Sequence, residues 1–179
     1  MLKLIYKNFI PESKILDLGF GQGSEVLFLA QNNFIVEAID KSDAMVQQLN
    51  NKVVNLNLAN VKLDQIDIRD YEIAANKFEV IICKDVLNFI SRTEALKIID
   101  DIKSKIKNGG YILIEVFTIE DPSFKKESKF LFYFELQELL KLFSDFKIYY
   151  YFENMILDPG HLGFVTAHQH GVARLIARK

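Results

Sequence analysis

The sequence of 179 residues has no tryptophan, three prolines and a single cysteine. With one thiol the chain cannot form an internal disulfide, and the apolar residues around Cys83 predict a buried structural role for it. No uncharged apolar run approaches the roughly 18 residues that a membrane-spanning helix needs. The first ten residues are interrupted by charge and lack the apolar core of a signal peptide. We therefore expect a cytoplasmic protein without a membrane partner.

A strong excess of positive charge is also missing. The 22 lysines and arginines are balanced by 24 aspartates and glutamates, which gives a formal net charge of −2. Proteins that bind nucleic acid usually need a basic surface to neutralise phosphates, so this balance argues against DNA as a partner. Apolar content, by contrast, is ample. Half of the residues are hydrophobic, enough for a globular fold, and the length suits one domain over residues 1–179.

Short apolar runs alternate with longer helical patterns through the first two thirds of the chain. A nearly continuous apolar run such as 78–83 predicts a strand buried on both faces of a parallel sheet. Ser42, and the capping-box pair Ser91 and Glu94, predict the starts of two helices. The predicted strands are 14–18, 34–39, 61–67, 78–83 and 111–117, and the predicted helices are 24–32, 42–52 and 91–107.

The pattern changes after the fifth predicted strand. Residues 118–129 are polar and predict a loop, and residues 134–143 predict an amphipathic helix. Two last strands, 146–153 and about 172–178, leave no room for a helix between them, so we expect them to be antiparallel. The elements together predict an α/β fold with a Rossmann-like, doubly wound sheet of seven strands, five parallel and a C-terminal antiparallel pair. The apolar side of the helix over 134–143 would consist of Leu136, Leu139, Leu140 and Phe143.

A glycine-rich loop, Asp17-Leu18-Gly19-Phe20-Gly21-Gln22-Gly23, joins the first predicted strand to the first helix. Glycines let the backbone approach a ligand closely and adopt positive φ angles. The nicotinamide and flavin pattern G-x-G-x-x-G needs a glycine where this chain has Ser24. The alternating spacing instead favours a cofactor with no pyrophosphate to place on the helix end, and S-adenosylmethionine is such a cofactor.

Carboxylates stand at the ends of three successive predicted strands, where ligands of open α/β sheets bind. Asp17 can orient the glycine loop or bind the ammonium group of the cofactor. Asp40 lies 21 residues after Gly19, where dinucleotide folds place a carboxylate that accepts hydrogen bonds from ribose hydroxyls. Asp67 can accept a hydrogen bond from the adenine amino group, with Ile68 beside the ring. Helix capping by Asp40 and a turn at Asp67 are the structural alternatives.

These motifs resemble those of the class I S-adenosylmethionine-dependent methyltransferases over nearly the whole chain. Residues 15–23 are similar to the first motif, although Phe20 stands where the family usually has a smaller residue. Residues 78–90 resemble the fourth motif, and 107–114 resemble the turn before the fifth strand. The resemblance implies S-adenosylmethionine as cofactor and S-adenosylhomocysteine as product. The predicted cofactor-binding residues are Asp17, Gly19, Phe20, Gly21, Gly23, Asp40, Lys41, Asp67, Ile68 and Lys84.

Within that class the chain resembles the small methyltransferases of the tellurite-resistance type. The likeness lies in the compact length and in residues 86–90, 130–135, 151–153 and 175–179. That family tends to carry a His-Arg pair shortly after the sixth strand, and here His161 falls near that place but is followed by leucine. We expect a small-molecule methyl acceptor, with a thiol and a metalloid oxyanion as candidates.

Few residues are needed for the chemistry itself, because methyl transfer is an in-line displacement in which positioning supplies most of the rate. A base is needed only where the acceptor must lose a proton. The predicted catalytic residues are His161 and Asp85, which follows the fourth strand; a charge that favours a helix start is the alternative for Asp85. If extended, His168 and His170 point to one face. No metal site is expected, because histidines without an adjacent carboxylate or cysteine make a weak metal signature.

Two other functions remain open at this point. An RNA or protein methyltransferase is the first, and a basic patch of Lys125, Lys126 and Lys129 beside the pocket would favour it. A non-catalytic module that binds S-adenosylmethionine is the second, which the intact glycine and acidic positions oppose. The chain lacks the proline-rich motif of amino-methylating DNA enzymes, and Cys83 lacks the preceding proline of cytosine C5 enzymes. Both observations argue against DNA and cytosine substrates.

Overall fold

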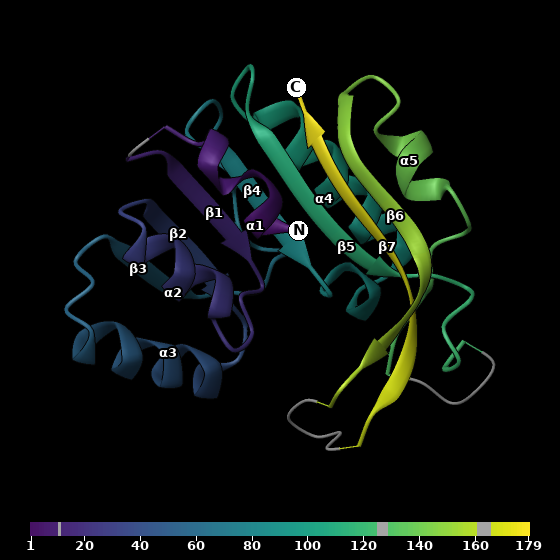
Figure 1. Ribbon diagram of the computed structural model, residues 1–179, viewed down its shortest axis with the longest axis horizontal. Helices are drawn as coiled ribbons and strands as arrows, with labels where there is room; N and C mark the ends of the chain where they lie inside the picture. Colours follow the sequence, from purple (N-terminus) through teal and green to yellow (C-terminus); the bar gives the residue numbers. More distant parts are fainter. Residues whose placement is uncertain (11, 125–128, 161–165) are drawn as a thin grey trace.

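The computed structural model describes residues 1–10, 12–124, 129–160 and 166–179. These residues form a seven-stranded sheet in the order β3-β2-β1-β4-β5-β7-β6 (Figure 1). Strands β1 to β5 are parallel, and β7 pairs antiparallel with both β5 and β6. The predicted α/β sheet with a C-terminal antiparallel pair is therefore confirmed. The strands are β1 (Lys14–Leu18), β2 (Ile35–Asp40), β3 (Val61–Gln65), β4 (Val80–Lys84), β5 (Tyr111–Phe117), β6 (Lys147–Asp158) and β7 (His168–Arg178).

Helices cover both faces of the sheet, which explains why β5 is buried at every residue. One face packs against α1 (Leu2–Ile5), α2 (Ser24–Gln31) and α3 (Asp43–Asn55). The other packs against α4 (Arg92–Lys105) and α5 (Glu138–Leu142). Short 3-10 turns lie at Tyr6–Asn8 (η1) and Leu87–Phe89 (η2). No helix among these described elements is long and apolar enough to cross a membrane.

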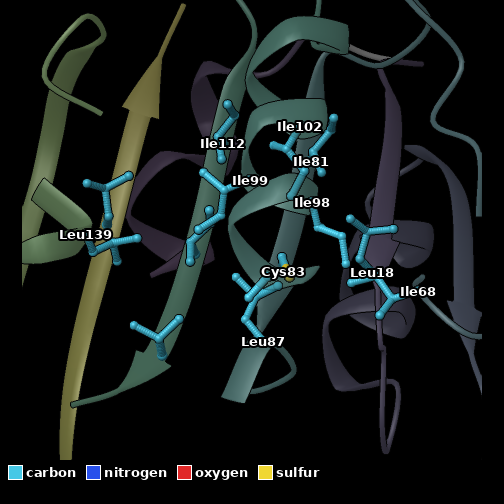
Figure 2. Close-up of a cluster of buried hydrophobic side chains, with 14 of the residues drawn as sticks. Leu18, Ile68, Ile81, Cys83, Leu87, Ile98, Ile99, Ile102, Ile112 and Leu139 are labelled. Atoms are coloured by element: carbon cyan, nitrogen blue, oxygen red, sulfur yellow. The ribbon is translucent and has the colours of Figure 1, made fainter. Parts of the chain in front are cut away.

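The isoleucines of α4 show how the two-sided packing is achieved. Ile99 and Ile102 lie one turn apart and both are fully buried. In Figure 2 they gather with Ile98 over Ile81 of β4 and Ile112 of β5. Burying each such side chain contributes about 1.5–3 kcal/mol to stability. The apolar period of the sequence therefore positions α4 over β4 and β5, and with them the residues that follow β4.

The two predicted helix caps are confirmed. Ser42 accepts a hydrogen bond from the Met45 backbone N–H at 3.4 Å. Ser91 and Glu94 form both hydrogen bonds of a capping box at the start of α4. Cys83 is fully buried in the core, as predicted.

The helix predicted over residues 134–143 is wrong in its first half. Phe134 is instead extended, because its N–H donates to Phe117 O at 3.1 Å and its carbonyl accepts from Ile119 N–H at 3.0 Å. Gln137 then takes a left-handed φ of 59°, and its N–H donates to the Glu153 carboxylate. Only residues 138–142 are helical, and Leu136, predicted on the apolar side, is exposed. Backbone pairing with distant residues thus overrides the local helical period.

Strands β6 and β7 are longer than the sequence predicts and form a hairpin that extends beyond the parallel strands (Figure 1). The last residue of β5, Phe117, pairs with Val172, so residues 168–171 have no partner in β5. In the strand register they pair with β6, and His168 lies opposite Asp158. The β7 part of this extension, residues 168–171, is polar and therefore gives no apolar run from which a strand could be predicted.

Candidate functional site

A cavity of about 450 Å³ opens at the carboxyl edge of β1, β2, β3 and β4. Its volume lies within the range typical of small-molecule pockets. The fold thus brings together residues from four strand ends that are up to 67 positions apart, from 17 to 84. Of the predicted cofactor-binding residues, those that line the cavity are Asp17, Gly19, Phe20, Gly21, Asp40, Lys41, Asp67, Ile68 and Lys84.

The three glycines of the loop have different tasks. Gly19 has a φ of 77°, and a Cβ there would lie 2.2 Å from Val86 Cγ2. A Cβ at Gly23 would lie 2.5 Å from Leu49 Cδ1, so this glycine is required by packing and is not among the lining residues that the structure describes. Gly21 differs, because no described atom lies within 4 Å of a Cβ built there. Gly21 therefore leaves open the space into which a ligand can approach the backbone.

Asp40, at the end of β2, holds the glycine loop in place. One carboxylate oxygen accepts the Gly21 N–H and the other accepts the Ser42 N–H, each at 2.9 Å. A carboxylate has about four lone-pair positions, so two hydrogen bonds leave capacity for a ligand. The cap of α3 belongs to Ser42 and not to Asp40.

Asp67, after β3, is engaged by Arg69. Its carboxylate accepts the Arg69 backbone N–H at 3.0 Å and two guanidinium N–H groups at 2.8 and 2.9 Å. These hydrogen bonds lower the pKa of Asp67 to about 2. The turn expected as the structural alternative is therefore present. Asp67 also lines the cavity, and its contact with adenine stays a prediction.

Asp17, at the end of β1, is only 4% exposed although it lines the cavity. Burial, followed by the negative charges of Glu25 and Asp40, raises the pKa of Asp17 to about 8; the nearby Lys84 acts in the opposite direction. At neutral pH the free protein therefore holds Asp17 protonated. A cation placed beside it would favour the carboxylate.

Asp85 follows β4 in a left-handed conformation with a φ of 56°. Its N–H donates to Glu115 O at 3.0 Å, and its side chain lines the cavity. Among the described residues, Asp85 Oδ1 is one of two buried side-chain polar atoms without a hydrogen-bond partner. Burial and then the charge of Glu115 raise the pKa of Asp85 to about 7, against the effects of Lys84 and Arg174. This carboxyl group can thus exchange a proton near neutral pH.

A chain of charged groups surrounds Asp85, and the sequence analysis identified only one of them. Lys84 donates to Glu25 at 2.6 Å, and its ammonium lies 4.0 Å from Glu115. Arg174 of β7 pairs with Glu115 at 2.7 Å. No local motif marks Glu25, Glu115 or Arg174, because their proximity depends on the sheet order. These ion pairs connect Glu25 and Lys84, which line the cavity, to Glu115 of β5 and Arg174 of β7.

Asn88, in the turn after β4, is a further residue that sequence reasoning missed. It is fully buried, and its amide donates to Phe117 O and Phe132 O, both at 2.9 Å. Its carbonyl oxygen accepts the Phe117 N–H at 2.9 Å. Asn88 therefore ties the cavity wall to the end of β5 and to residues 130–134. The sequence does mark Asn88 in one way, because it is a polar residue inside the apolar run 86–90.

We expect the substitution Asn88→Ala to lower the free energy of unfolding by about 2–4 kcal/mol, because the Phe117 N–H and Phe132 O lose their side-chain partner and Phe117 O keeps, among the described residues, only the Phe134 N–H. Urea unfolding followed by circular dichroism measures this loss. Asn51→Ala on the exposed surface of α3 is the matched control and should change stability by less than about 0.5 kcal/mol. Equal stabilities of the two variants would contradict the role of Asn88.

The structure brings two of the three histidines, His168 and His170, close together. His161 lies outside the described residues, so its predicted catalytic role stays a prediction. The rings of His168 and His170 lie 4.6 Å apart on one face, as the alternation predicts. The expectation that no carboxylate adjoins them is wrong, since His170 Nδ1 lies 2.8 Å from Asp121 Oδ2. Pairing of β5 with β7 brings this aspartate close across 49 positions of sequence.

The remaining predicted residues are placed as follows. Phe20, which stands where the family usually has a smaller residue, both lines the cavity and packs in the core, with 6% exposure. Lys125 and Lys126 lie outside the described residues. Lys129 places its ammonium 5.2 Å from the ring centre of Phe89, which lines the cavity.

Comparison with known families gives a match over most of the chain. The model of the family "Tellurite resistance protein TehB" matches residues 6–162. "Probable S-adenosyl-L-methionine-dependent methyltransferase TehB" of Haemophilus influenzae is 31% identical over 148 residues, which cover 83% of this chain and 51% of that protein. "Hemagglutinin 1" of Eikenella corrodens is 29% identical, over 88% of this chain and 54% of its own length. The chain thus spans about half the length of these curated relatives.

Solved structures give the same result. The crystal structure of TehB from Haemophilus influenzae superposes with a TM-score of 0.86 at 28% identity, over 99% of this chain and 61% of that one. An S-adenosylmethionine-dependent methyltransferase from Methanosarcina mazei superposes with a TM-score of 0.78 at 17% identity, over 100% of this chain and 98% of the other. The second likeness concerns the fold alone.

Proposed function

Since this chain belongs to the tellurite resistance protein TehB family of class I methyltransferases, we propose that it transfers a methyl group from S-adenosylmethionine to a small-molecule acceptor. A thiol and a metalloid oxyanion are the acceptor classes that we favour. We further propose that residues 1–179 act as one methyltransferase domain. The observation that carries the function is the cavity at the strand ends, which is lined by both the glycine loop and the buried Asp85.

The residues present fit S-adenosylmethionine. The cavity volume of about 450 Å³ suits a ligand of this size, and the space beside Gly21 permits close approach to the loop. We assign the ribose hydroxyls to Asp40, which has acceptor capacity beyond its two backbone partners. We assign the ammonium group to Asp17, the adenine amino group to Asp67 and the adenine ring to Ile68. Lys41 and Lys84 complete the polar lining.

When bound, the cofactor supplies an electrophilic methyl group on a positively charged sulfur. The protein's contribution is to hold an acceptor in line with that methyl group and to exclude water. An acceptor that carries a proton must lose it as the new bond to carbon forms. We propose that the Asp85 carboxylate accepts this proton, because its pKa of about 7 leaves a large fraction ionised at neutral pH. The proton balance closes, since a neutral acceptor gives a neutral methylated product and one proton on Asp85.

The test of the proposed function has two parts. Calorimetry with S-adenosylmethionine, S-adenosylhomocysteine and NAD should show binding of both sulfur compounds and not of NAD. A methyl-transfer screen should then compare small thiols, metalloid oxyanions, amines and RNA side by side. Absence of binding to both sulfur compounds would contradict the proposal. Transfer to RNA alone would favour the RNA methyltransferase, and binding without any transfer would favour a non-catalytic module.

The protonation of Asp17 gives a pH-dependent prediction for cofactor binding. An ammonium group beside Asp17 binds best to the carboxylate, which the free protein forms only as the pH rises through about 8. S-adenosylhomocysteine should therefore bind roughly fivefold more tightly at pH 8 than at pH 7, with release of a proton at pH 7. Calorimetry in phosphate and in Tris measures that proton from the difference in heat.

Asp17→Asn is the matched control, because it keeps the shape of the side chain and cannot titrate. Its affinity for S-adenosylhomocysteine should be nearly the same at pH 7 and pH 8. A wild-type affinity that is equally independent of pH would contradict the contact between Asp17 and the ammonium group.

A further inference from the structure

The hairpin of β6 and β7 carries three metal-ligating side chains that the proposed methyl transfer does not use. Asp158, His168 and His170 each offer a ligand atom, and these atoms lie within 4.8 Å of one another. The two histidines are two positions apart on β7, so their side chains leave the same face of the strand. Asp158 lies directly opposite His168 in the antiparallel register. All three are half-buried, which limits competition from bulk water.

Both imidazoles are oriented by their Nδ1 atoms. His170 Nδ1 lies 2.8 Å from Asp121 Oδ2, and His168 Nδ1 lies 2.9 Å from Thr166 O. A carbonyl oxygen can only accept, so His168 donates its Nδ1–H, and the same assignment suits the carboxylate beside His170. An imidazole that donates Nδ1–H to an oxygen presents the lone pair of Nε2, the usual state of a metal-ligating histidine.

Asp121 is itself held in place, as the outer partner of a ligand should be. It is 3% exposed and accepts hydrogen bonds from the Ser123 N–H at 2.8 Å and the Gly171 N–H at 3.2 Å. A carboxylate bonded to the far nitrogen of a ligating histidine is the common outer shell of zinc sites. The arrangement therefore includes both a ligand set and the support that such a set needs.

We propose that Asp158, His168 and His170 form a binding site for a divalent first-row transition-metal ion, with zinc as the ion that best suits two imidazoles and one carboxylate. In a tetrahedral zinc site with bonds of about 2.0–2.1 Å, neighbouring ligand atoms lie about 3.4 Å apart. Side-chain rotations that bring the ligand atoms closer together by roughly 1–1.5 Å give this spacing. Among the described residues three protein ligands are thus available for a tetrahedral ion.

The site lies on the same edge of the sheet as the cavity, behind a layer of aromatic rings. The His170 ring lies 4.9 Å from the ring of Phe117, which stacks on Phe130 at 4.5 Å. Phe130 in turn contacts Phe89, which lines the cavity. These rings separate the metal ligands from the cavity, so an ion bound there would not occupy the space assigned to the cofactor. The metal site itself does not depend on the proposed methyl transfer.

Metal binding by the full chain, free of any affinity tag and stripped with a chelator, tests the proposal. Titration with Co²⁺, followed by its visible absorption, and with Zn²⁺, in competition with a chromophoric chelator, should each give one equivalent. Removing a ligand costs more than the roughly 10–100-fold of an outer-shell change, so His168→Gln, His170→Gln and Asp158→Asn should each weaken binding by at least about 100-fold. Asp100→Asn, on the exposed side of α4, should leave the affinity unchanged.

Asp121→Asn separates the positioning role from general structural damage. It should weaken Zn²⁺ binding by about 10–100-fold and keep the Co²⁺ spectrum, because the ligands themselves remain. Binding of S-adenosylhomocysteine by every variant serves as the measure of an intact fold. Failure of the wild type to bind either ion would overturn the proposal, as would wild-type affinity in folded His168→Gln and His170→Gln.

Discussion

Replacing Asp85 by asparagine is expected to lower kcat/KM for methyl transfer by about 10²–10⁴-fold, the usual contribution of a positioned general base. Asparagine keeps the size of the side chain but cannot accept a proton. The assay uses whichever proton-bearing acceptor gives the highest kcat/KM in the screen. Binding of S-adenosylhomocysteine should change little, because our proposal assigns Asp85 to the acceptor and gives it no cofactor contact.

The wild-type pH profile provides a sharper test of the same role. Only the carboxylate can act as base, so kcat/KM should rise about tenfold per pH unit below about 7 and level off above it. Glu115→Gln removes the negative charge that raises the pKa of Asp85, so the midpoint of the profile should move to lower pH. A flat wild-type profile, or an unchanged rate in Asp85→Asn, would exclude Asp85 as the base.

The substitution Asp40→Ala is expected to weaken the binding of S-adenosylhomocysteine by about 100-fold or more. Asp40 accepts two backbone N–H groups that shape the loop and, in our assignment, the ribose hydroxyls. Hydrogen bonds to a charged group contribute about 1.5–3 kcal/mol each, and losing two of them costs about 3 kcal/mol or more. Isothermal calorimetry on the purified protein measures the change.

Asp43→Ala is the matched control for Asp40, three residues further along the chain. Asp43 is exposed and bonds only to Gln47 among the residues that the structure describes. Its removal should alter the affinity by less than about twofold. Near-equal affinities of Asp40→Ala and the wild type would remove the ribose assignment.

The sequence predicts those parts of the fold and site that depend on local pattern. The apolar runs locate the parallel strands, because a strand covered on both faces needs continuous hydrophobic residues. The spacing of Gly19, Gly21 and Gly23 and the position of Asp40 locate the cavity, because the carboxyl ends of parallel strands meet at one edge. In these parts of the chain, the residues that form the strands and the cavity lie within or next to a motif that can be recognised in the sequence.

Features that depend on distant contacts are not predictable in this way. The extended backbone at Phe134 results from pairing with Phe117, which the helical period of residues 134–143 does not reveal. Asn88 is satisfied by carbonyls 29 and 44 positions away. The carboxylate beside His170 comes from Asp121, on the far side of a strand pairing. In each case the sheet order decides which side chains meet, and periodicity carries no information about it.

The sheet order also determines when the sheet can close during synthesis. Strand β7 is the last of the seven strands to leave the ribosome, yet it lies inside the sheet, between β5 and β6. Until it emerges, β5 presents an unpaired apolar edge and β6 has no neighbour, a state that invites association with other chains. The final strand closes the sheet and brings Arg174 to Glu115 in the same event.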